Sequence, residues 1–321
     1  MTREGDQSDF DSAIVRDFEH LDARAILQGI GVQAGGEANS LQTGAGSDVI
    51  AGGGGRDVID SGAGDDNVVI DGSERSVRGG VGNDVLYLAG ESVTSVDLSR
   101  ADQTGGDAAN VSGFEAVDFS ESTRSITLRG DAGANAFIVN DQSATIDGGE
   151  GFDTVDYTFV DTREGIRVAT GPAGLTVTFS GQTTAQFLTG IEAIIGSEFN
   201  DRLVGNSSAN RLEGGVGADT LVGGAGDILS GGRGNDVLLG TQGAETFLFD
   251  FEDDGLIGQD QIAGIGAGDK VTIDFEDDME LDYSFSETPI GSSTLYVIDF
   301  GFAGRITLTG TFDPVTQLTF I

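Results

Sequence analysis

Single apolar residues recur along the chain at an interval of nine residues. They occupy the eighth place of each nonapeptide counted from residue 34, and the spacing returns in residues 196–248 with one residue deleted in GGAGDILS. A three-residue strand supplies one such side chain when only its central residue faces a thin core. The pattern therefore predicts stacked short strands. The two sets are Leu41, Ile50, Ile59, Val68, Val77 and Leu86, and Leu203, Leu212, Leu221, Leu229, Leu238 and Phe247.

The six residues that separate these strands follow the pattern GGxGxD and must reverse the chain. Glycine supplies the positive φ that such turns require. Two strands and two turns complete one coil of a parallel roll, so that every second nonapeptide lies on the same side. Successive coils are then about 4.8 Å apart. The sequence therefore predicts an all-β fold.

The sixth place of each nonapeptide is mostly acidic. Carboxylates stacked one coil apart repel each other by about 3 kcal/mol at an effective dielectric of about 20. A divalent cation between the coils removes this repulsion, and carboxylate and carbonyl oxygens suit Ca²⁺ better than Mg²⁺, which demands a tight octahedron. We therefore expect several Ca²⁺ ions as cofactors. The sixth-place residues are Asn39, Asp48, Asp57, Asp66, Arg75 and Asp84 in the first array, and Asp201, Asn210, Asp219, Asp227, Asp236 and Glu245 in the second.

A degenerate array lies between the two regular ones. Its eighth places remain apolar, whereas its sixth places are mostly not acidic, so core packing and ion binding are separable roles. The eighth places are Leu128, Phe137, Ile146 and Val155, and the sixth places are Ile126, Asn135, Ala144 and Asp153.

The charge of the chain limits its partners. Asp and Glu number 54 against 16 Lys and Arg, which gives a formal net charge of −38. A polyanion repels phosphates, so we expect no nucleic acid partner, and the natural small partner is a cation. Adaptation to a salty habitat is a second source of acidity, but it does not explain the spacing. The absence of cysteine leaves oxygen as the metal ligand, and no run of 18 apolar residues predicts a transmembrane segment.

The glycine-rich segments resemble the repeats-in-toxin (RTX) family, whose motif is GGxGxDxUx. The resemblance implies a right-handed parallel β-roll that depends on calcium, export by a type I ABC transporter, and an extracellular or cell-surface location. The closest matches are GGGGRDVID (52–60), GGVGNDVLY (79–87), GGEGFDTVD (148–156), GGVGADTLV (214–222) and GGRGNDVLL (231–239).

The predicted metal ligands are sixth-place side chains and the glycines of the same turns. The side chains are Asp48, Asp57, Asp66, Asp84, Asp153, Asp201, Asn210, Asp219, Asp227 and Asp236. The glycines are Gly44, Gly46, Gly53, Gly55, Gly62, Gly64, Gly80, Gly82, Gly215, Gly217, Gly224, Gly226, Gly232 and Gly234.

Arg75 breaks the acidic pattern at a sixth place. Its guanidinium would lie beside Asp57 one coil away, where a carboxylate and a metal ion are otherwise expected. A cation held there can pair with the carboxylate directly. We therefore expect Arg75 to replace calcium between these two turns.

Seven segments are predicted along the chain. Residues 11–27 have an apolar spacing compatible with an amphipathic helix, and residues 157–195 read as a β-hairpin excursion. The segments are an N-terminal cap (1–33), a first calcium array (34–87), an insertion (88–120), degenerate repeats (121–156), the hairpin excursion (157–195), a second calcium array (196–248), and a C-terminal β cap with an export signal implied by the resemblance (249–321).

Candidate catalytic chemistry is sparse. His20 is the only histidine, and GIGAGDK (264–270) resembles a phosphate-binding loop without its lysine-serine ending. The predicted function is a secreted calcium-binding protein without an enzymatic centre, for which a cell-surface or matrix polysaccharide is the candidate macromolecular partner. One alternative is a calcium-dependent polysaccharide lyase or epimerase that uses Arg163 and Arg167. The other is an accessory module of a larger RTX protein.

Overall fold

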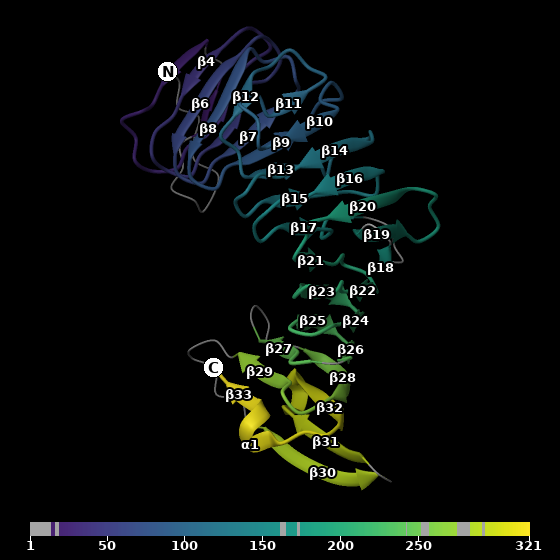
Figure 1. The fold of residues 1–321 in the computed structure, drawn as a ribbon. Helices are drawn as coiled ribbons and strands as arrows, with labels where there is room; N and C mark the ends of the chain where they lie inside the picture. Colours follow the sequence, from purple (N-terminus) through teal and green to yellow (C-terminus); the bar gives the residue numbers. More distant parts are fainter. Residues whose placement is uncertain are drawn as a thin grey trace. The chain divides into compact units, whose positions relative to one another are not determined.

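The computed structural model shows a chain that is almost entirely β-structure and divides into two compact units, Met1–Asp153 and Thr154–Ile321. Figure 1 shows successive short strands stacked within each unit. The structure describes residues 14–16, 19–160, 165–171, 174–241, 243–251, 257–274, 283–290 and 293–321.

The first unit consists of short strands joined by glycine-rich turns. Most of its strands are two to four residues long, as one inward side chain per nonapeptide requires. They are β1 (Ile14–Arg16), β2 (His20–Asp22), β3 (Gly31–Gln33), β4 (Ser40–Gln42), β5 (Val49–Ala51), β6 (Val58–Ala63), β7 (Asn67–Ile70), β8 (Ser76–Val81), β9 (Val85–Leu88), β10 (Ser95–Asp97), β11 (Thr104–Gly105), β12 (Val111–Ser112), β13 (Ala116–Asp118), β14 (Ile126–Arg129), β15 (Ala136–Ile138) and β16 (Ala144–Asp147).

Alternate strands of this unit form two parallel sheets, one on each side of the roll. One sheet runs β1, β3, β5, β7, β9, β13 and β15, and the other runs β2, β4, β6, β8 and β12. The eighth-place residues are in register across each sheet, as in the pairs Ile50–Val68 and Leu41–Ile59. The predicted parallel roll is therefore confirmed.

The second unit repeats this plan and adds antiparallel strands at two places. Its strands are β17 (Thr154–Asp156), β18 (Ile166–Gly171), β19 (Gly174–Phe179), β20 (Ala185–Thr189), β21 (Ala193–Ile195), β22 (Arg202–Val204), β23 (Arg211–Gly217), β24 (Thr220–Val222), β25 (Ile228–Gly234), β26 (Val237–Leu239), β27 (Thr246–Asp250), β28 (Gly258–Ile265), β29 (Lys270–Asp274), β30 (Ser284–Ile290), β31 (Ser293–Asp299), β32 (Gly304–Gly310) and β33 (Leu318–Phe320). Its helices are the 3₁₀ turn η1 (Gly301–Ala303) and α1 (Pro314–Gln317).

Two parallel sheets again form the sides of the roll. One runs β17, β21, β23, β25, β27, β29 and β33, and the other runs β18, β22, β24, β26, β28 and β32. In the 157–195 excursion, β18 pairs antiparallel with β19, and β19 pairs antiparallel with β20. At the C-terminal end, β30, β31 and β32 form an antiparallel arrangement.

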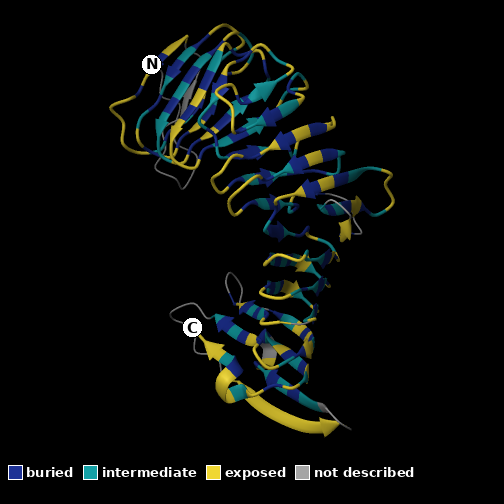
Figure 2. Cartoon of the chain, in the orientation of Figure 1, coloured by how far each residue is buried: buried dark blue, intermediate teal, exposed yellow. Residues whose placement is uncertain are grey.

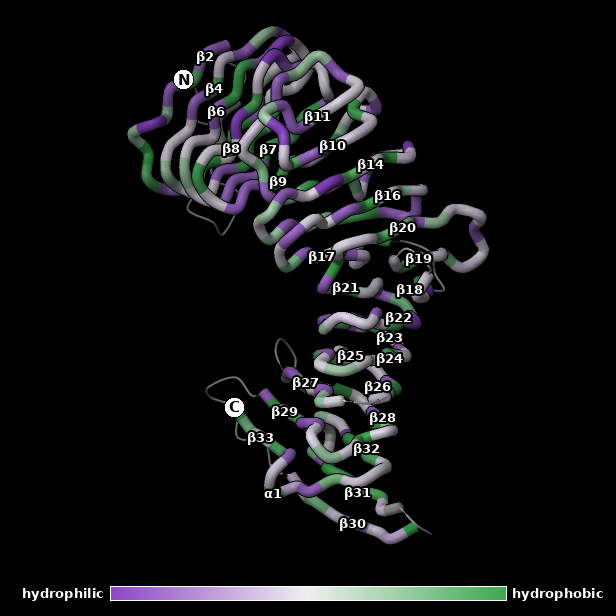
Figure 3. The backbone as a smooth tube through the Cα atoms, viewed as in Figure 1, coloured by the Kyte–Doolittle hydropathy of each residue, from purple (hydrophilic) through white to green (hydrophobic). Residues whose placement is uncertain are grey.

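The core of each unit is a file of single apolar side chains. All the eighth-place residues of the three arrays are at most 1% exposed, including those of the degenerate array, whose sixth places are mostly not acidic. Figure 2 shows buried and less buried residues alternating along the strands, and Figure 3 shows the matching alternation of hydropathy. Core packing therefore requires the apolar residue at the eighth place but not an acidic residue at the sixth place.

The roll extends beyond the predicted arrays at both ends. The helix expected over residues 11–27 is wrong for the described part, because β1 and β2 lie there and pair with β3 and β4. In the segment expected as a C-terminal cap, β28 and β29 continue the parallel sheets of the second array. Parallel stacking of short strands thus begins before residue 34 and continues after residue 248, although the spacing there is no longer nine residues.

Candidate metal centre

The sixth-place aspartates lie one above another along the edges of the roll. In the first unit, Asp48 N donates to Asp66 Oδ1 over 2.8 Å, and Asp66 N donates to Asp84 Oδ1 over 3.0 Å. On the other edge, Asn39 N donates to Asp57 Oδ1 over 2.7 Å. Each carboxylate therefore accepts the backbone N–H of the sixth-place residue one coil earlier.

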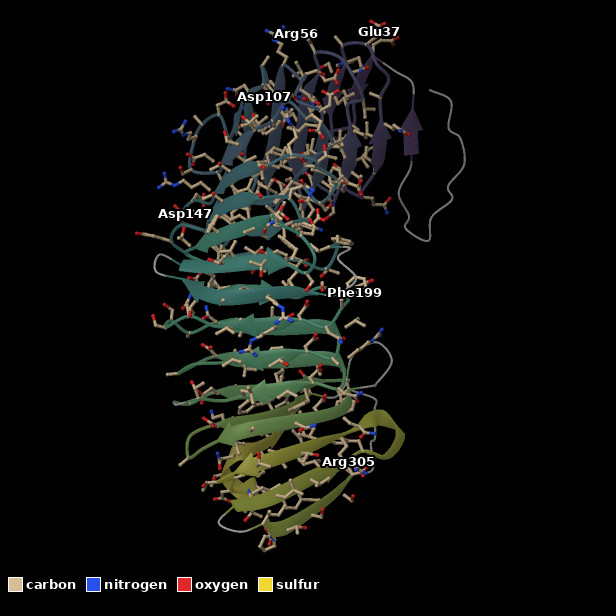
Figure 4. All side chains as sticks on the ribbon, turned by 90° about the vertical axis from the view of Figure 1, so that its right-hand side faces the viewer. Glu37, Arg56, Asp107, Asp147, Phe199 and Arg305 are labelled. Atoms are coloured by element: carbon tan, nitrogen blue, oxygen red, sulfur yellow. The ribbon has the colours of Figure 1, made fainter. Side chains whose placement is uncertain are left out.

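The second unit has the same columns. Asp201 N donates to Asp219 Oδ1 over 2.7 Å, and Asp219 N donates to Asp236 Oδ1 over 2.8 Å. On the other edge, Asn210 N donates to Asp227 Oδ1 over 2.8 Å. The fifth-place side chain differs from the sixth. In Figure 4, Arg56 projects outward from the turn that holds the buried Asp57.

The second carboxylate oxygen separates eight of the nine predicted aspartates into two groups, and the ninth, Asp153, accepts Asn135 N through Oδ1 over 2.8 Å. In Asp201 the second oxygen accepts Ser197 N over 2.5 Å, and in Asp227 it accepts Gly224 N over 2.7 Å. In the other group this oxygen is buried without a hydrogen-bond partner, although an unpaired buried charge costs several kcal/mol. That group is Asp48, Asp57, Asp66, Asp84, Asp219 and Asp236.

Burial raises the pKa of three of these carboxyl groups well above the ordinary value. It raises the pKa of Asp66 to about 7, and the charges of Asp48 and Asp84 add to the shift. Burial likewise raises the pKa of Asp219 to about 7, again with its column neighbours contributing. The pKa of Asp236 rises to about 6 through burial. The columns therefore favour a bound proton or a bound cation over bare charge.

Acidification should therefore stabilise the metal-free fold. The folded pKa of Asp66 and Asp219 is about 7, above the ordinary 3.8, so the folded chain binds these protons more tightly than the unfolded chain. The resulting stability is fully present below about pH 4 and is lost as the pH rises through about 7. Circular dichroism in metal-free buffer should show more β-structure at about pH 5 than at about pH 8. More β-structure at about pH 8 than at about pH 5 would contradict the raised pKa of Asp66 and Asp219.

The turn glycines bring backbone carbonyls between the coils. Gly64 has a φ of 116°, and a Cβ there would lie 2.6 Å from Gly46 O. Glycine supplies the positive φ expected in these turns at most of the predicted positions, but Gly44, Gly46 and Gly224 lack it. At Gly44 contact is the reason, because a Cβ would lie 1.9 Å from Ile26 O. The predicted glycines with a left-handed φ are Gly53, Gly55, Gly62, Gly64, Gly80, Gly82, Gly215, Gly217, Gly226, Gly232 and Gly234.

The expected pairing of Arg75 with Asp57 is wrong. Arg75 N donates to Asp57 O over 2.8 Å, but the Arg75 side chain is exposed and Asp57 Oδ2 has no hydrogen-bond partner. Glu74 is buried instead, where its carboxylate accepts Asp71 N over 2.9 Å and Gly72 N over 2.8 Å. The turn thus holds a second carboxylate inside and leaves the cation outside.

Asparagine at a sixth place forms hydrogen bonds within and between turns. Asn39 Nδ2 donates to Gly35 O over 3.3 Å and to Gly52 O over 3.4 Å. In Asn210, a predicted metal ligand, Oδ1 accepts Asn206 N over 2.7 Å and Nδ2 donates to Ile191 O over 3.4 Å. At these places a neutral amide N–H donates to backbone carbonyls of the turns.

Three acids in the columns were missed by the repeat pattern. Asp84 N donates to Glu115 Oε2 over 2.9 Å, Asp236 N to Asp260 Oδ1 over 2.9 Å, and Glu245 N to Asp269 Oδ1 over 3.1 Å. Each precedes by two residues a buried apolar residue, which was the available signal. Those apolar residues are Val117, Ile262 and Val271. GIGAGDK is accordingly a turn of the roll that contains Asp269.

The remaining candidates do not converge on a centre. His20 is exposed on β2 and Arg167 is exposed on β18, while Arg163 lies outside the described residues. Within the described ranges, no group of three or more His, Asp or Glu side chains is arranged to hold a metal. The columns instead combine carboxylate pairs with backbone carbonyls. The part of the chain that the structure describes contains no helix suited to crossing a membrane.

Comparisons with known proteins identify the repeats. Residues 33–68, 195–227 and 226–256 match the family RTX calcium-binding nonapeptide repeat (4 copies). No curated protein sequence matches the chain. The extracellular lipase LipA from Serratia marcescens is similar in structure with a TM-score of 0.31 and 18% identity over 63% of this chain. The chain spans 42% of the lipase chain, and so low a TM-score supports no argument about activity.

Proposed function

The chain carries RTX calcium-binding nonapeptide repeats, and on this premise we propose that it is a secreted protein that binds several calcium ions between its turns and folds when it meets extracellular calcium. The observation that carries the proposal is the set of buried carboxylate oxygens without hydrogen-bond partners. Calcium supplies the positive charge that these oxygens require, and oxygen is its preferred ligand.

The surroundings of these oxygens fit a calcium ion. A Cβ on Gly214 would lie 2.4 Å from Asp219 Oδ2 and 2.5 Å from Gly231 O, so only glycine allows this carboxylate and this carbonyl to lie close together. Asp201 and Asp236 lie one coil away on either side of Asp219. When bound, calcium would neutralise the column and join successive turns.

The low calcium affinity expected of such turns indicates that the chain folds outside the cell. Extracellular calcium modules typically bind with dissociation constants of about 10⁻⁴ to 10⁻³ M. At the low calcium of the cytosol the columns stay charged and the chain stays unfolded, which suits passage through a type I ABC exporter. Outside the cell, the folded acidic surface would act by binding a cell surface or a matrix polysaccharide, with calcium as the shared ion.

Equilibrium dialysis of the full chain tests the proposal. Four carboxylate pairs from the predicted ligands stack one coil apart, namely Asp48–Asp66, Asp66–Asp84, Asp201–Asp219 and Asp219–Asp236. We therefore expect at least four calcium ions per chain in the millimolar range. Magnesium at the same concentration is the control and should leave these sites largely empty. Binding of fewer than one calcium per chain would overturn the proposed function.

A further inference from the structure

Glu115 continues a column of carboxylates through a segment that contains no nonapeptide motif. β13 pairs in parallel with β9, and this register places Ala116 opposite Val85. Glu115 therefore lies one coil beyond Asp84. Asp84 N donates to Glu115 Oε2 over 2.9 Å, and Glu115 N donates to Asp84 O over 3.1 Å. The first of these contacts, from a backbone N–H to the carboxylate one coil later, is the one that links the sixth-place aspartates within the regular arrays.

Oxygen atoms lie close together beside Asp84. Asp84 is fully buried, and its Oδ2 has no hydrogen-bond partner. A Cβ on Gly79 would lie 2.8 Å from Asp84 Oδ2 and 1.9 Å from Gly113 O. Only a residue without a side chain allows these two oxygens to lie so close to residue 79, and Gly113 contributes its carbonyl from the segment without repeats.

The same arrangement occurs in a matched repeat of the second unit. There the missing Cβ of Gly214 would lie 2.4 Å from Asp219 Oδ2 and 2.5 Å from Gly231 O. Asp219 N donates to the next carboxylate of its column, as Asp84 N does to Glu115. The segment after Asp84 thus reproduces the surroundings of a repeat turn with different residues.

The charges beside Asp84 need a cation. Two carboxylates about one coil apart repel by about 3 kcal/mol at an effective dielectric of about 20. On the far side of Glu115, Asn135 Nδ2 donates to Glu115 O over 3.1 Å. The neighbour of Glu115 on that side is therefore a neutral amide. Between Asp84 and Glu115, by contrast, both side chains are acidic.

We infer that Asp84, Glu115 and the carbonyl of Gly113 form a further calcium site, in which Glu115 and Gly113 come from outside the nonapeptide motifs. The inference rests on the proposed function, because it assigns the same ion to the same kinds of ligand. Calcium bound there joins β9 to β13 across the 88–120 segment. The site therefore makes the ordering of that segment depend on calcium.

Glu115→Gln tests the site, with Glu121→Gln as the matched control because Glu121 is exposed in the same unit. Isothermal calorimetry on the full chain should give one fewer calcium per chain for Glu115→Gln and an unchanged number for Glu121→Gln. An unchanged number for Glu115→Gln would overturn the site. If the wild type then still binds at least four calcium ions, only the Glu115 site is overturned and the proposed function stands. A wild type that binds no calcium would overturn both the site and the proposed function.

A crystal of the wild type grown in calcium provides a second test of the site, and this test does not depend on whether the variant folds. Its anomalous difference map should show a peak within about 2.3 to 2.6 Å of Asp84 Oδ2 and Gly113 O. If Glu115→Gln does not fold, this map alone shows whether calcium binds beside Asp84. A map with peaks in the regular turns but none beside Asp84 would overturn the site while supporting the proposed function.

Discussion

The full-length chain, once freed of calcium, is expected to lose most of its β-structure at neutral pH and to regain it on addition of millimolar calcium. The net charge is −38, and the unpaired oxygens of the buried aspartates lie in stacked columns. At one hundred times the dissociation constant, each independent site contributes about 2.7 kcal/mol. Four sites then contribute about 11 kcal/mol, comparable with the whole stability of a typical domain, about 5–15 kcal/mol.

Far-UV circular dichroism during a calcium titration measures this transition. Sodium chloride at matched ionic strength is the control for screening, because salt weakens repulsion between exposed charges without binding between coils. Magnesium is the control for divalent charge. The spectrum should change cooperatively with calcium alone. A native, well-dispersed NMR spectrum in excess chelator at neutral pH would rule out calcium-dependent folding.

Asp66→Asn is expected to weaken calcium binding on both sides of one column position. Asp66 lies between Asp48 and Asp84, and its Oδ1 accepts a backbone N–H that an asparagine Oδ1 can also accept. The other oxygen, which has no partner, becomes an NH₂ group that cannot bind a cation. Up to two ions should be lost. At calcium one hundred times the dissociation constant, that removes about 5 kcal/mol from the calcium-loaded fold.

The same variant should have the opposite effect without calcium. Burial raises the pKa of Asp66 to about 7, so its ionised form destabilises the metal-free fold at neutral pH and above. Asparagine removes that charge. Asp66→Asn should therefore make residual structure in metal-free buffer equal to or greater than that of wild type, while it lowers stability in saturating calcium.

Asp65→Asn is the matched control for this change. Asp65 is adjacent but exposed, and its Oδ1 accepts Asn83 N over 2.8 Å, a bond that asparagine preserves. The calcium midpoint for folding should increase severalfold in Asp66→Asn and remain near the wild-type value in Asp65→Asn. Equal midpoints in the two variants would show that the buried column does not bind the ion.

The ends of the roll show why local pattern was insufficient. The apolar spacing of Ile14, Val15 and Leu21 suits a helical face, but Val15 pairs beside Val32 and Leu21 beside Leu41. A strand of three residues has almost no local signature, because most of its stability comes from the neighbouring strand. The N-terminal coil is therefore determined by what it stacks upon.

The candidate site shows a similar division. Asp66 and Asp219 could be placed in columns by counting residues, because the repeats around them have almost constant length. Glu115 follows Asp84 after 31 residues, so counting by nine fails there, although the backbone returns to the same register. The repeat count correctly places Arg75 in this turn, but the side chain that is buried there belongs to Glu74.

The sequence by itself determined the repeat, the single file of apolar core residues and the carboxylate columns. Each depends only on a side chain recurring at a constant interval in a periodic backbone. Only the tertiary structure decided where the roll begins and ends, which carboxylate oxygens lack partners, and that Glu115, Asp260 and Asp269 belong to the columns. These features depend on the contact between one coil and the next, and insertions between coils hide that contact from residue spacing.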